Sequence, residues 1–323
     1  EIEFSDWSSD VCSSDLLNAL TKEYPECTED YKIISSYFAT RDFGGVYPSE
    51  LINQLKQLHK RDDEEEQLIE TLKPIVHIGM SYAICNPSKF PVGAAVYCKA
   101  SGNAYMGFNM ESEKRWIGYS VHGEQCSINN ALQHGEKVID LMVVSYVPCG
   151  HCRQFITQFP FRKTMTLFIV NIQKKCKIGD ILPFDFNPGD LPPIEFADVN
   201  KMVISKVEGD TVDQKFIDEV IDCAKKSHVD NLNIFCAVGL VVGDKVYCSN
   251  YLESCAHNPS LHPMNGAISI LNMNGKKVSD VEAVISVQYE GAPFWMEETT
   301  LGIIKGYGYK KSDRKSTRLN SSH

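Results

Sequence analysis

The sequence predicts an α/β protein in which one unit occurs twice, preceded by an N-terminal helical region. Helical patterns alternate with short apolar strands over residues 72–178, as is typical of layered α/β domains. A segment rich in proline and glycine follows at residues 182–193, and beyond it a helix and an apolar hairpin recur in the same order. A chain of 323 residues also suits two domains, because domains of about 100–150 residues are the commonest size.

The N-terminal part of the chain divides into a tail and a helical region. We expect residues 1–16, and likewise residues 313–323, to be non-native tails, because neither has a periodic apolar pattern; native disordered tails are the alternative. Residues 17–71 are predicted to be helical, with Leu51, Leu55 and Leu58 on one stripe. A charge run at residues 60–66 interrupts this stripe, and we interpret it as a solvated turn or helix face.

The first domain, residues 72–178, is predicted from a series of helices and short strands. A helix over residues 72–84 stops before Asn86 and Pro87, and a hairpin follows at residues 92–97 and 104–108. Next come a helix at 124–133, a strand at 141–146, a helix at 149–158 and a strand at 166–170. Residues 179–210 are predicted to be the linker, and residues 211–312 the second domain, with a helix at 216–226 and strands at 234–242 and 245–248.

Composition argues against several kinds of partner. The net charge is -10, and no basic cluster offsets it, so we expect no nucleic-acid partner; Lys174, Lys175 and Lys177 form only a short stretch that we interpret as a solvated loop. No run of about 18 apolar residues predicts a membrane span, and no secretion signal is recognisable. We therefore expect a cytoplasmic protein whose 12 cysteines are reduced thiols, apart from any metal ligands.

Two cysteines have the spacing of a metal-binding pair. Cys149 and Cys152 lie where a predicted strand gives way to a helix, so both sulfurs can face one point beside the positive helix end. This setting favours thiolates, the form that binds zinc. By itself the pair also fits a redox site or a structural zinc site.

A motif upstream of the cysteines favours a catalytic zinc site over the alternatives. His122 supplies a third ligand, which leaves one tetrahedral position open for water, and Glu124 is placed to handle the protons of that water. Taken singly, His122 is compatible with a packed histidine and Glu124 with a first-turn carboxylate. The order H-x-E and then P-C-x-x-C is the known signature of zinc deaminases. His151 is assigned to packing or to support of the metal ligands, because a fourth protein ligand would exclude the water.

Four linked motifs resemble the homodimeric, two-domain cytidine deaminase family. They are FPVGAA at residues 90–95, FNME at 108–111, HGEQ at 122–125 and PCGHCRQ at 148–154. The resemblance implies duplicated three-layer α/β/α domains with a mixed sheet, one Zn²⁺ per subunit and a homodimer. It also implies hydrolysis of cytidine and deoxycytidine to uridine and deoxyuridine, with release of ammonia, in pyrimidine salvage.

The resemblance also assigns substrate-binding residues. Asn109 and Glu111 correspond to a pair that grips the ribose hydroxyl groups; a polar strand end is the alternative. Phe90 corresponds to an aromatic residue that lies against the nucleoside, and otherwise it is a core residue. Phe186, in the linker, corresponds to a residue that reaches the site of the neighbouring subunit.

The second domain is expected to be non-catalytic. Met264 stands where the proton-handling glutamate belongs, and Ala292, Pro293 and Phe294 stand near the position of the cysteine pair. Residues 251–253, Tyr-Leu-Glu, replace residues 109–111, so the ribose grip is incomplete there.

Two other functions use the same residues. One is a deaminase acting on cytosine within RNA or DNA, because the zinc signature serves both; the acidic charge and the Asn109/Glu111 pair favour a free nucleoside. The other is a catalytically silent zinc or nucleoside-binding protein. Retention of Glu124 in the first domain argues against it.

Overall fold

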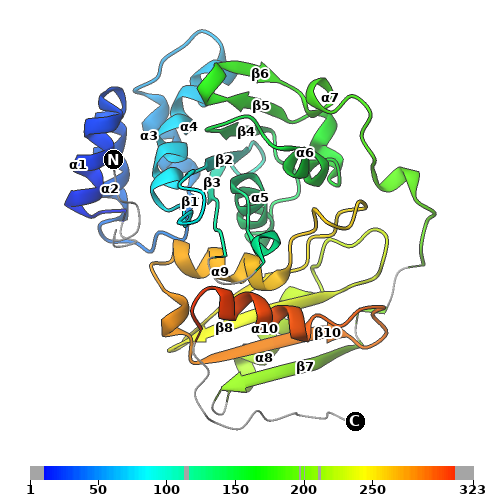
Figure 1. The fold of residues 1–323 in the computed structure, drawn as a ribbon. Coiled ribbons are helices and arrows are strands. Elements are labelled where there is room, and N and C mark those ends of the chain that lie inside the picture. The colour runs from blue at the N-terminus through cyan, green and yellow to red at the C-terminus, as the bar shows by residue number, and fades with distance from the viewer. Residues whose placement is uncertain (1–10, 113–115, 196–197, 200, 210–211, 310–323) are drawn as a thin grey trace. The chain divides into compact units, whose positions relative to one another are not determined.

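The computed structural model describes residues 11–112, 116–195, 198–199, 201–209 and 212–309 (Figure 1). The chain forms two compact units. The first unit contains the described residues of Glu1–Glu111, Val121–Asp185 and Met273–Gly275, and the second those of Ser112–Ser120, Phe186–Asn272 and Lys276–His323. The predicted tails fall largely outside the described residues.

Among the described residues, four α-helices precede the central strands of the first sheet. They are α1 (Ser14–Glu23), α2 (Thr28–Phe38), α3 (Ser49–Lys56) and α4 (Glu64–Ser81). Helix α1 begins inside the range predicted as a tail, where Ser13 accepts a hydrogen bond from the Leu16 N–H at 3.1 Å and Val11 is buried. The predicted stripe is correct for Leu51 and Leu55, but Leu58 is exposed because α3 has already ended.

Helix α4 differs from the prediction at its start. The Asp63 carboxylate accepts hydrogen bonds from the N–H groups of Glu65 and Glu66, at 2.8 and 3.2 Å, and so caps the helix. Acidic residues in the first turn also complement the helix dipole. The charge run is therefore the start of α4, and the boundary predicted between residues 71 and 72 lies inside this helix.

The first sheet is mixed, as expected. Its strands lie in the order β1 (Val46–Tyr47), β3 (Asn103–Phe108), β2 (Gly93–Cys98), β4 (Leu141–Val144), β5 (Thr166–Ile169) and β6 (Lys174–Cys176). Only β4 and β5 are parallel, and α6 (Gly150–Ile156) lies in the crossover between them. The lysine stretch interpreted as a loop forms edge strand β6.

Two glycines show that helices cover both faces of this sheet. A Cβ atom on Gly93 would lie 2.0 Å from the Val76 carbonyl oxygen of α4. One on Gly107 would lie 2.3 Å from the backbone nitrogen of Ser127 in α5 (Gly123–Gln133). Gly93 pairs with Phe108, so the neighbouring residue Gly107 faces the opposite side. The first unit therefore has three α/β/α layers.

The second sheet departs from the expected mixed pattern. Its strands lie in the order β7 (Met202–Gly209), β10 (Ala283–Tyr289), β8 (Cys236–Val242) and β9 (Lys245–Asn250), and all these pairs are antiparallel. β7 comes from the segment predicted to be linker, and it pairs with β10 where β5 pairs with β4 in the first unit. The linker also contains the short helix α7 (Ile178–Ile181) at its start.

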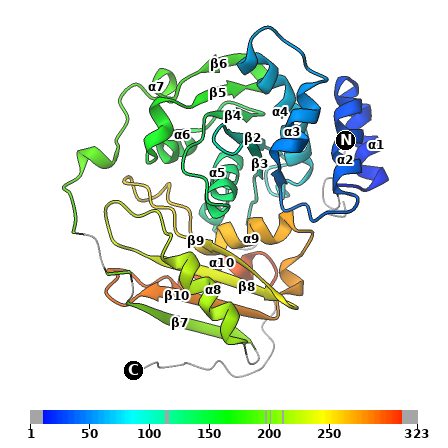
Figure 2. The same ribbon diagram turned by 180° about the vertical axis from the view of Figure 1, so that it is seen from behind.

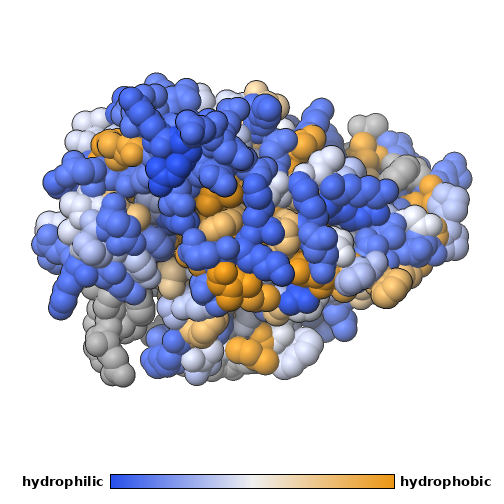
Figure 3. Space-filling view, turned by 90° about the horizontal axis from the view of Figure 1, so that it is seen from above, coloured by the Kyte–Doolittle hydropathy of each residue, from blue (hydrophilic) through white to orange (hydrophobic). Residues whose placement is uncertain are grey.

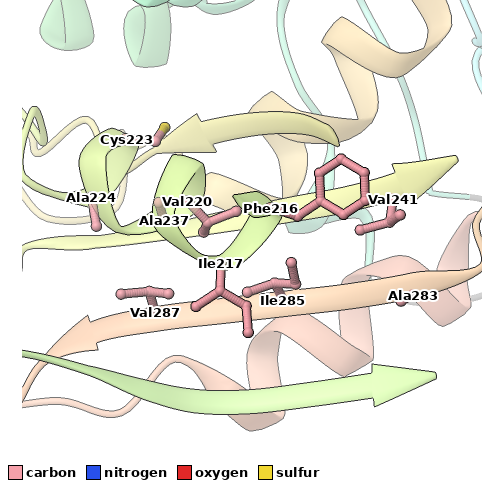
Figure 4. Close-up of a cluster of buried hydrophobic side chains, with 10 residues drawn as sticks. All are labelled: Phe216, Ile217, Val220, Cys223, Ala224, Ala237, Val241, Ala283, Ile285 and Val287. Atoms are coloured by element: carbon pink, nitrogen blue, oxygen red, sulfur yellow. The ribbon is translucent and has the colours of Figure 1, made fainter. Parts of the chain in front are cut away.

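Helices cover both faces of the second sheet as well. Figure 4 shows α8 (Gln214–Ala224) packed through Phe216, Ile217 and Val220 against β8 and β10. Figures 1 and 2, seen from opposite sides, place α10 (Glu297–Gly306) on the other face. The remaining helix of this unit, α9 (Pro263–Met273), follows β9.

The two units repeat one local hydrogen-bond pattern. In the first, Met110 bridges to Ile84 in parallel and to Val121 in antiparallel orientation. In the second, Leu252 bridges in the same ways to His228 and Leu261. This repetition makes residues 109–111 and 251–253 equivalent, which supports a duplicated fold.

The surface is mainly hydrophilic on the face shown in Figure 3, with smaller groups of hydrophobic residues between the polar ones. Within the described ranges, no helix has the length and apolar character needed to cross a membrane.

Candidate metal centre

Helix α5 and its preceding bridge position His122. The bridge between Met110 and Val121 ends one residue before His122, which is the N-cap of α5 in extended conformation. The Gln125 side chain accepts a hydrogen bond from the His122 N–H at 3.3 Å. This contact satisfies a backbone donor and fixes the direction in which the helix starts.

Helix α6 positions the two cysteines. Cys149 is its N-cap and is exposed, whereas Cys152, in the first turn, is completely buried. The Cys149 Sγ atom lies 3.7 Å from Cys152 Sγ and 3.5 Å from His122 Nδ1. The three ligand atoms all lie within 4.8 Å of one another. Sequence reasoning proposed these residues as ligands, and the structure brings them together.

The spacing of this triangle fits zinc. Tetrahedral coordination with Zn–S and Zn–N bonds of about 2.3 and 2.0 Å separates two sulfurs by about 3.8 Å, and a sulfur from a nitrogen by about 3.5 Å. The measured separations, 3.7 and 3.5 Å, match both. Within the described part of the chain, no other group of three His, Cys, Asp or Glu side chains converges in this way.

The two thiols have different electrostatic surroundings. A hydrogen bond from Cys152, together with His122, lowers the pKa of Cys149 to about 3. Burial raises the pKa of Cys152 well above the usual value for a thiol. Because zinc binds cysteine as the thiolate, the Cys152 thiol would lose its proton when zinc binds.

Glu124 lies next to this triangle. Its side chain is only 4% exposed, and burial raises the pKa of the carboxyl group. The Cys152 thiol forms a hydrogen bond with this carboxyl group. A carboxyl group whose pKa is shifted toward neutrality can both accept and donate a proton, as a general acid–base group must.

The residues on either side of Cys152, His151 and Arg153, support the motif in different ways. The ring of His151 stacks on His122 with centroids 4.8 Å apart and planes inclined by 18°. Arg153 donates hydrogen bonds to the carbonyl oxygens of Pro148 and Ile181, each at 2.8 Å. Arg153 thus fastens backbone segments around α6.

Asn109 is tied to the loop that precedes β2. Its Oδ1 accepts a hydrogen bond from the Val92 N–H at 2.7 Å, and its Nδ2 donates one to the Phe90 carbonyl oxygen at 3.0 Å. Asn109 therefore holds this loop in place. Its contact with a ribose stays a prediction.

Glu111 and Phe90 lie at the same loop. The Glu111 carboxylate accepts hydrogen bonds from the Ser88 N–H at 3.0 Å and the Ser88 hydroxyl at 2.6 Å. Phe90 is 48% exposed and its ring centroid lies 4.5 Å from that of Tyr146, so Phe90 is not a core residue. Sequence reasoning missed Ser88 and Tyr146; the position of Ser88 two residues before Phe90 was the available signal.

Phe186 belongs to the second unit and is 41% exposed. Its predicted role in a neighbouring subunit stays a prediction.

His262, in the same unit, forms a local contact. Its Nδ1 atom accepts a hydrogen bond from the Met264 N–H at 3.1 Å.

Comparison with known proteins agrees with this geometry. Residues 67–168 and 178–301 each match a family model described as "Cytidine and deoxycytidylate deaminase zinc-binding region". A protein of Vibrio cholerae serotype O1 named cytidine deaminase is 30% identical over 249 residues, which cover 77% of this chain and 81% of that protein. Cytidine deaminases of Proteus mirabilis and an Enterobacter species are 28% and 29% identical, over 87% of this chain and 92% of each relative.

Proposed function

This chain belongs to the cytidine and deoxycytidylate deaminase family, and we propose that its first unit hydrolyses cytidine and deoxycytidine to uridine and deoxyuridine with release of ammonia. The observation that carries this function is the buried Glu124 carboxyl group beside a His122, Cys149 and Cys152 triangle of zinc-binding dimensions. The protein is a zinc-dependent hydrolase.

The metal ligands and Glu124 have different roles in the proposed reaction. His122, Cys149 and Cys152 would hold the metal, and zinc in such a site lowers the pKa of water at its open position from 15.7 to about 7. Glu124 accepts the proton that the attacking water loses as its oxygen bonds to C4 of the base. Glu124 then gives this proton to N3, takes the remaining hydroxyl proton as the C4 carbonyl forms, and gives that second proton to the departing amino group, so that one water is consumed and ammonia leaves.

The loop before β2 supplies substrate recognition in this proposal. The exposed face of Phe90 stacks on the pyrimidine ring, and Asn109 and Glu111 bind the sugar hydroxyl groups. Support comes from the contacts of Asn109 with Phe90 and Val92 and of Glu111 with Ser88, which join these three groups into one rigid segment. Ser88 donates hydrogen bonds to both carboxylate oxygens of Glu111. A sugar hydroxyl group must therefore share these oxygens with Ser88 or displace it.

We place the reaction in pyrimidine salvage, in a homodimer of the cytoplasm. No disulfide joins any of the 12 cysteines, all of which lie in the described part of the chain, as is usual in a reducing compartment. The dimer follows from the family resemblance, and Phe186 is the residue proposed to cross to the neighbouring subunit.

The test is loss of the ultraviolet absorbance band of cytidine on mixing with the purified, zinc-assayed protein, with ammonia measured in parallel. Turnover that a chelator abolishes and added zinc restores is the expected result. Zinc-loaded protein that leaves cytidine and deoxycytidine intact would overturn the proposal, and salt-sensitive binding to single-stranded RNA or DNA would then indicate a polynucleotide substrate.

A further inference from the structure

The second unit contains a buried carboxylate with an unsatisfied oxygen. Glu253 is completely buried, and its Oε2 atom accepts hydrogen bonds from the N–H groups of Asp230 and Asn231, both at 2.7 Å. Its Oε1 atom is also buried but has no hydrogen-bond partner. Buried polar atoms in folded proteins nearly always have a partner, so this oxygen calls for one.

The described residues also provide no positive charge to balance the carboxylate of Glu253. No lysine or arginine of the described chain forms an ion pair with it, and the charge that influences it most is the carboxylate of Asp230, which is of the same sign. An isolated carboxylate is far more costly to bury than a neutral polar group. A positive charge from outside the chain would remove this cost.

The second unit contains further buried oxygens of this kind. Three more buried oxygens, Asn231 Oδ1, Ser254 Oγ and Asn265 Oδ1, have no hydrogen-bond partner. Asn231 and Ser254 are held beside Glu253 by the 2.7 Å bond from the Asn231 N–H and by the chain itself. Asn265 lies in the first turn of α9, which follows the bridge between Leu252 and Leu261.

The equivalent residue of the first unit shows what is missing. Glu111 has the same place in the repeated bridge pattern, and both of its oxygens accept hydrogen bonds from Ser88. At Glu253 the chain provides donors to one oxygen alone. The second unit thus retains the carboxylate but lacks half of its partners.

We propose that the second unit binds a monovalent cation of the size of ammonium or potassium at Glu253, with Asn231 Oδ1 as a further ligand and Ser254 next to it in the chain. A single positive charge balances a single carboxylate, and both ions are bound through oxygen atoms. Divalent cations usually require several carboxylates, whereas Glu253 is the only carboxylate among the described side chains that have a buried oxygen without a partner.

Thermal unfolding in different salts at equal ionic strength tests the site without any substrate. The zinc-loaded protein should melt roughly 2–4 °C higher in about 100 mM potassium or ammonium chloride than in tetramethylammonium chloride, because only the small ions enter the site. Comparison of the two small ions identifies the natural occupant, and isotope-labelled ammonium should give a separate NMR signal when bound.

Variants test whether the difference in melting temperature between the salts depends on Glu253. Glu253→Gln keeps an oxygen for the Asp230 and Asn231 N–H groups but removes the charge, so the difference between salts should disappear. Asn231→Ala, a second route if Glu253→Gln does not fold, should raise the salt concentration needed for half of the effect. Glu298→Gln, the same change at an exposed glutamate of the same unit, should leave the effect intact.

Equal melting temperatures in all the salts would overturn the proposal and indicate that Glu253 is protonated and donates to Asn231. A salt effect that persists in Glu253→Gln would overturn it too, because the cation would then bind elsewhere. Neither result bears on cytidine turnover, which is measured separately and depends on the first unit.

Discussion

At the scale of single residues, burial and close neighbours decide what each functional group does. Cys149 and Cys152 are chemically identical, yet the exposed one has a lowered pKa and the buried one a raised pKa. Glu124 and Glu111 are both carboxylates near the centre, but Glu124 is enclosed and Glu111 is bonded by Ser88 at the surface. This difference agrees with the roles that we propose, proton handling for Glu124 and recognition for Glu111.

Replacement of Glu124 by glutamine should separate zinc binding from turnover. Glu124→Gln keeps the shape of the side chain but cannot accept a proton, so kcat should fall by roughly 10²–10⁴-fold while zinc content stays at one per chain. Metal analysis and cytidine turnover on one preparation measure both. Glu66→Gln, at an exposed position of α4, is the matched control, and near-normal kcat in Glu124→Gln would contradict the assigned role.

At the scale of elements, the close approach of α5 to β3 sets the position of His122. A Cβ atom on Gly107 would lie 2.3 and 2.4 Å from backbone atoms of Ser127 and Gly123. Backbone atoms cannot move aside as the end of a flexible side chain can. The first turn of α5, which begins directly after His122, therefore lies where it does because residue 107 has no side chain.

Gly107→Ala should consequently affect both stability and metal binding. We expect a loss of about 1–3 kcal/mol or more of unfolding free energy, and weaker zinc binding because α5 is pushed away from the cysteines. Urea denaturation and a zinc competition assay measure these effects. Gly179→Ala is the matched control, since a Cβ atom there meets nothing within 4 Å, and an unchanged Gly107→Ala protein would show that α5 can move freely.

At the scale of the whole molecule, duplication provides two units of which one carries the centre. The bridge pattern recurs around Met110 and Leu252, but only the first unit has the converging His and Cys ligands among the described residues. The second unit keeps a histidine, His262, whose Nδ1 is used by its own helix start. Each unit also contains a histidine whose pKa burial lowers, His77 and His262.

These two histidines predict acid sensitivity of the folded protein. Burial, assisted for His77 by Lys73, lowers the pKa of His77 from 6.5 to about 4, and burial lowers that of His262 to about 3. Below pH 6.5 the unfolded chain binds protons that the folded chain does not, so stability is complete above that pH and falls as the pH drops toward 4. His77 alone corresponds to roughly 3 kcal/mol.

Urea denaturation at pH 7.5 and at about pH 5 measures this dependence. His77→Gln stays neutral at both pH values and can still accept the hydrogen bond of the Tyr31 hydroxyl, which lies 3.0 Å from His77 Nδ1. It should lose part of the pH dependence. Equal pH dependence in the variant and the wild type would assign acid sensitivity to other groups.

The proposed homodimer makes a prediction for mixed subunits. Glu124→Gln and Phe186→Ala should each have low activity alone, but a hybrid dimer has one site with an intact Glu124 and an intact Phe186 from the other subunit. Mixing after dissociation should therefore restore activity, as measured by cytidine turnover. Activity that never exceeds the sum of the separate variants would place Phe186 in the site of its own subunit or in none.

The sequence by itself determined the chemistry of the centre. The ligands and Glu124 could be predicted because zinc requires particular donor atoms, and because two of them lie in a short motif at a helix start. The alternation of helices and strands, the hairpin at β2 and β3 and the duplication also follow from local patterns of apolar residues. The resemblance added the family and the substrate class.

Only the tertiary structure showed the features that depend on contacts between residues far apart in the sequence. The sequence did not show that β7 enters the second sheet antiparallel to β10, because an edge strand needs a partner strand and has no motif of its own. It did not show Ser88 on Glu111 or Tyr146 against Phe90, since hydrogen bonds and ring contacts between distant residues leave no periodic signal. The unsatisfied oxygen of Glu253 is of the same kind: it exists only because folding buries that carboxylate and brings donors to one of its two oxygens.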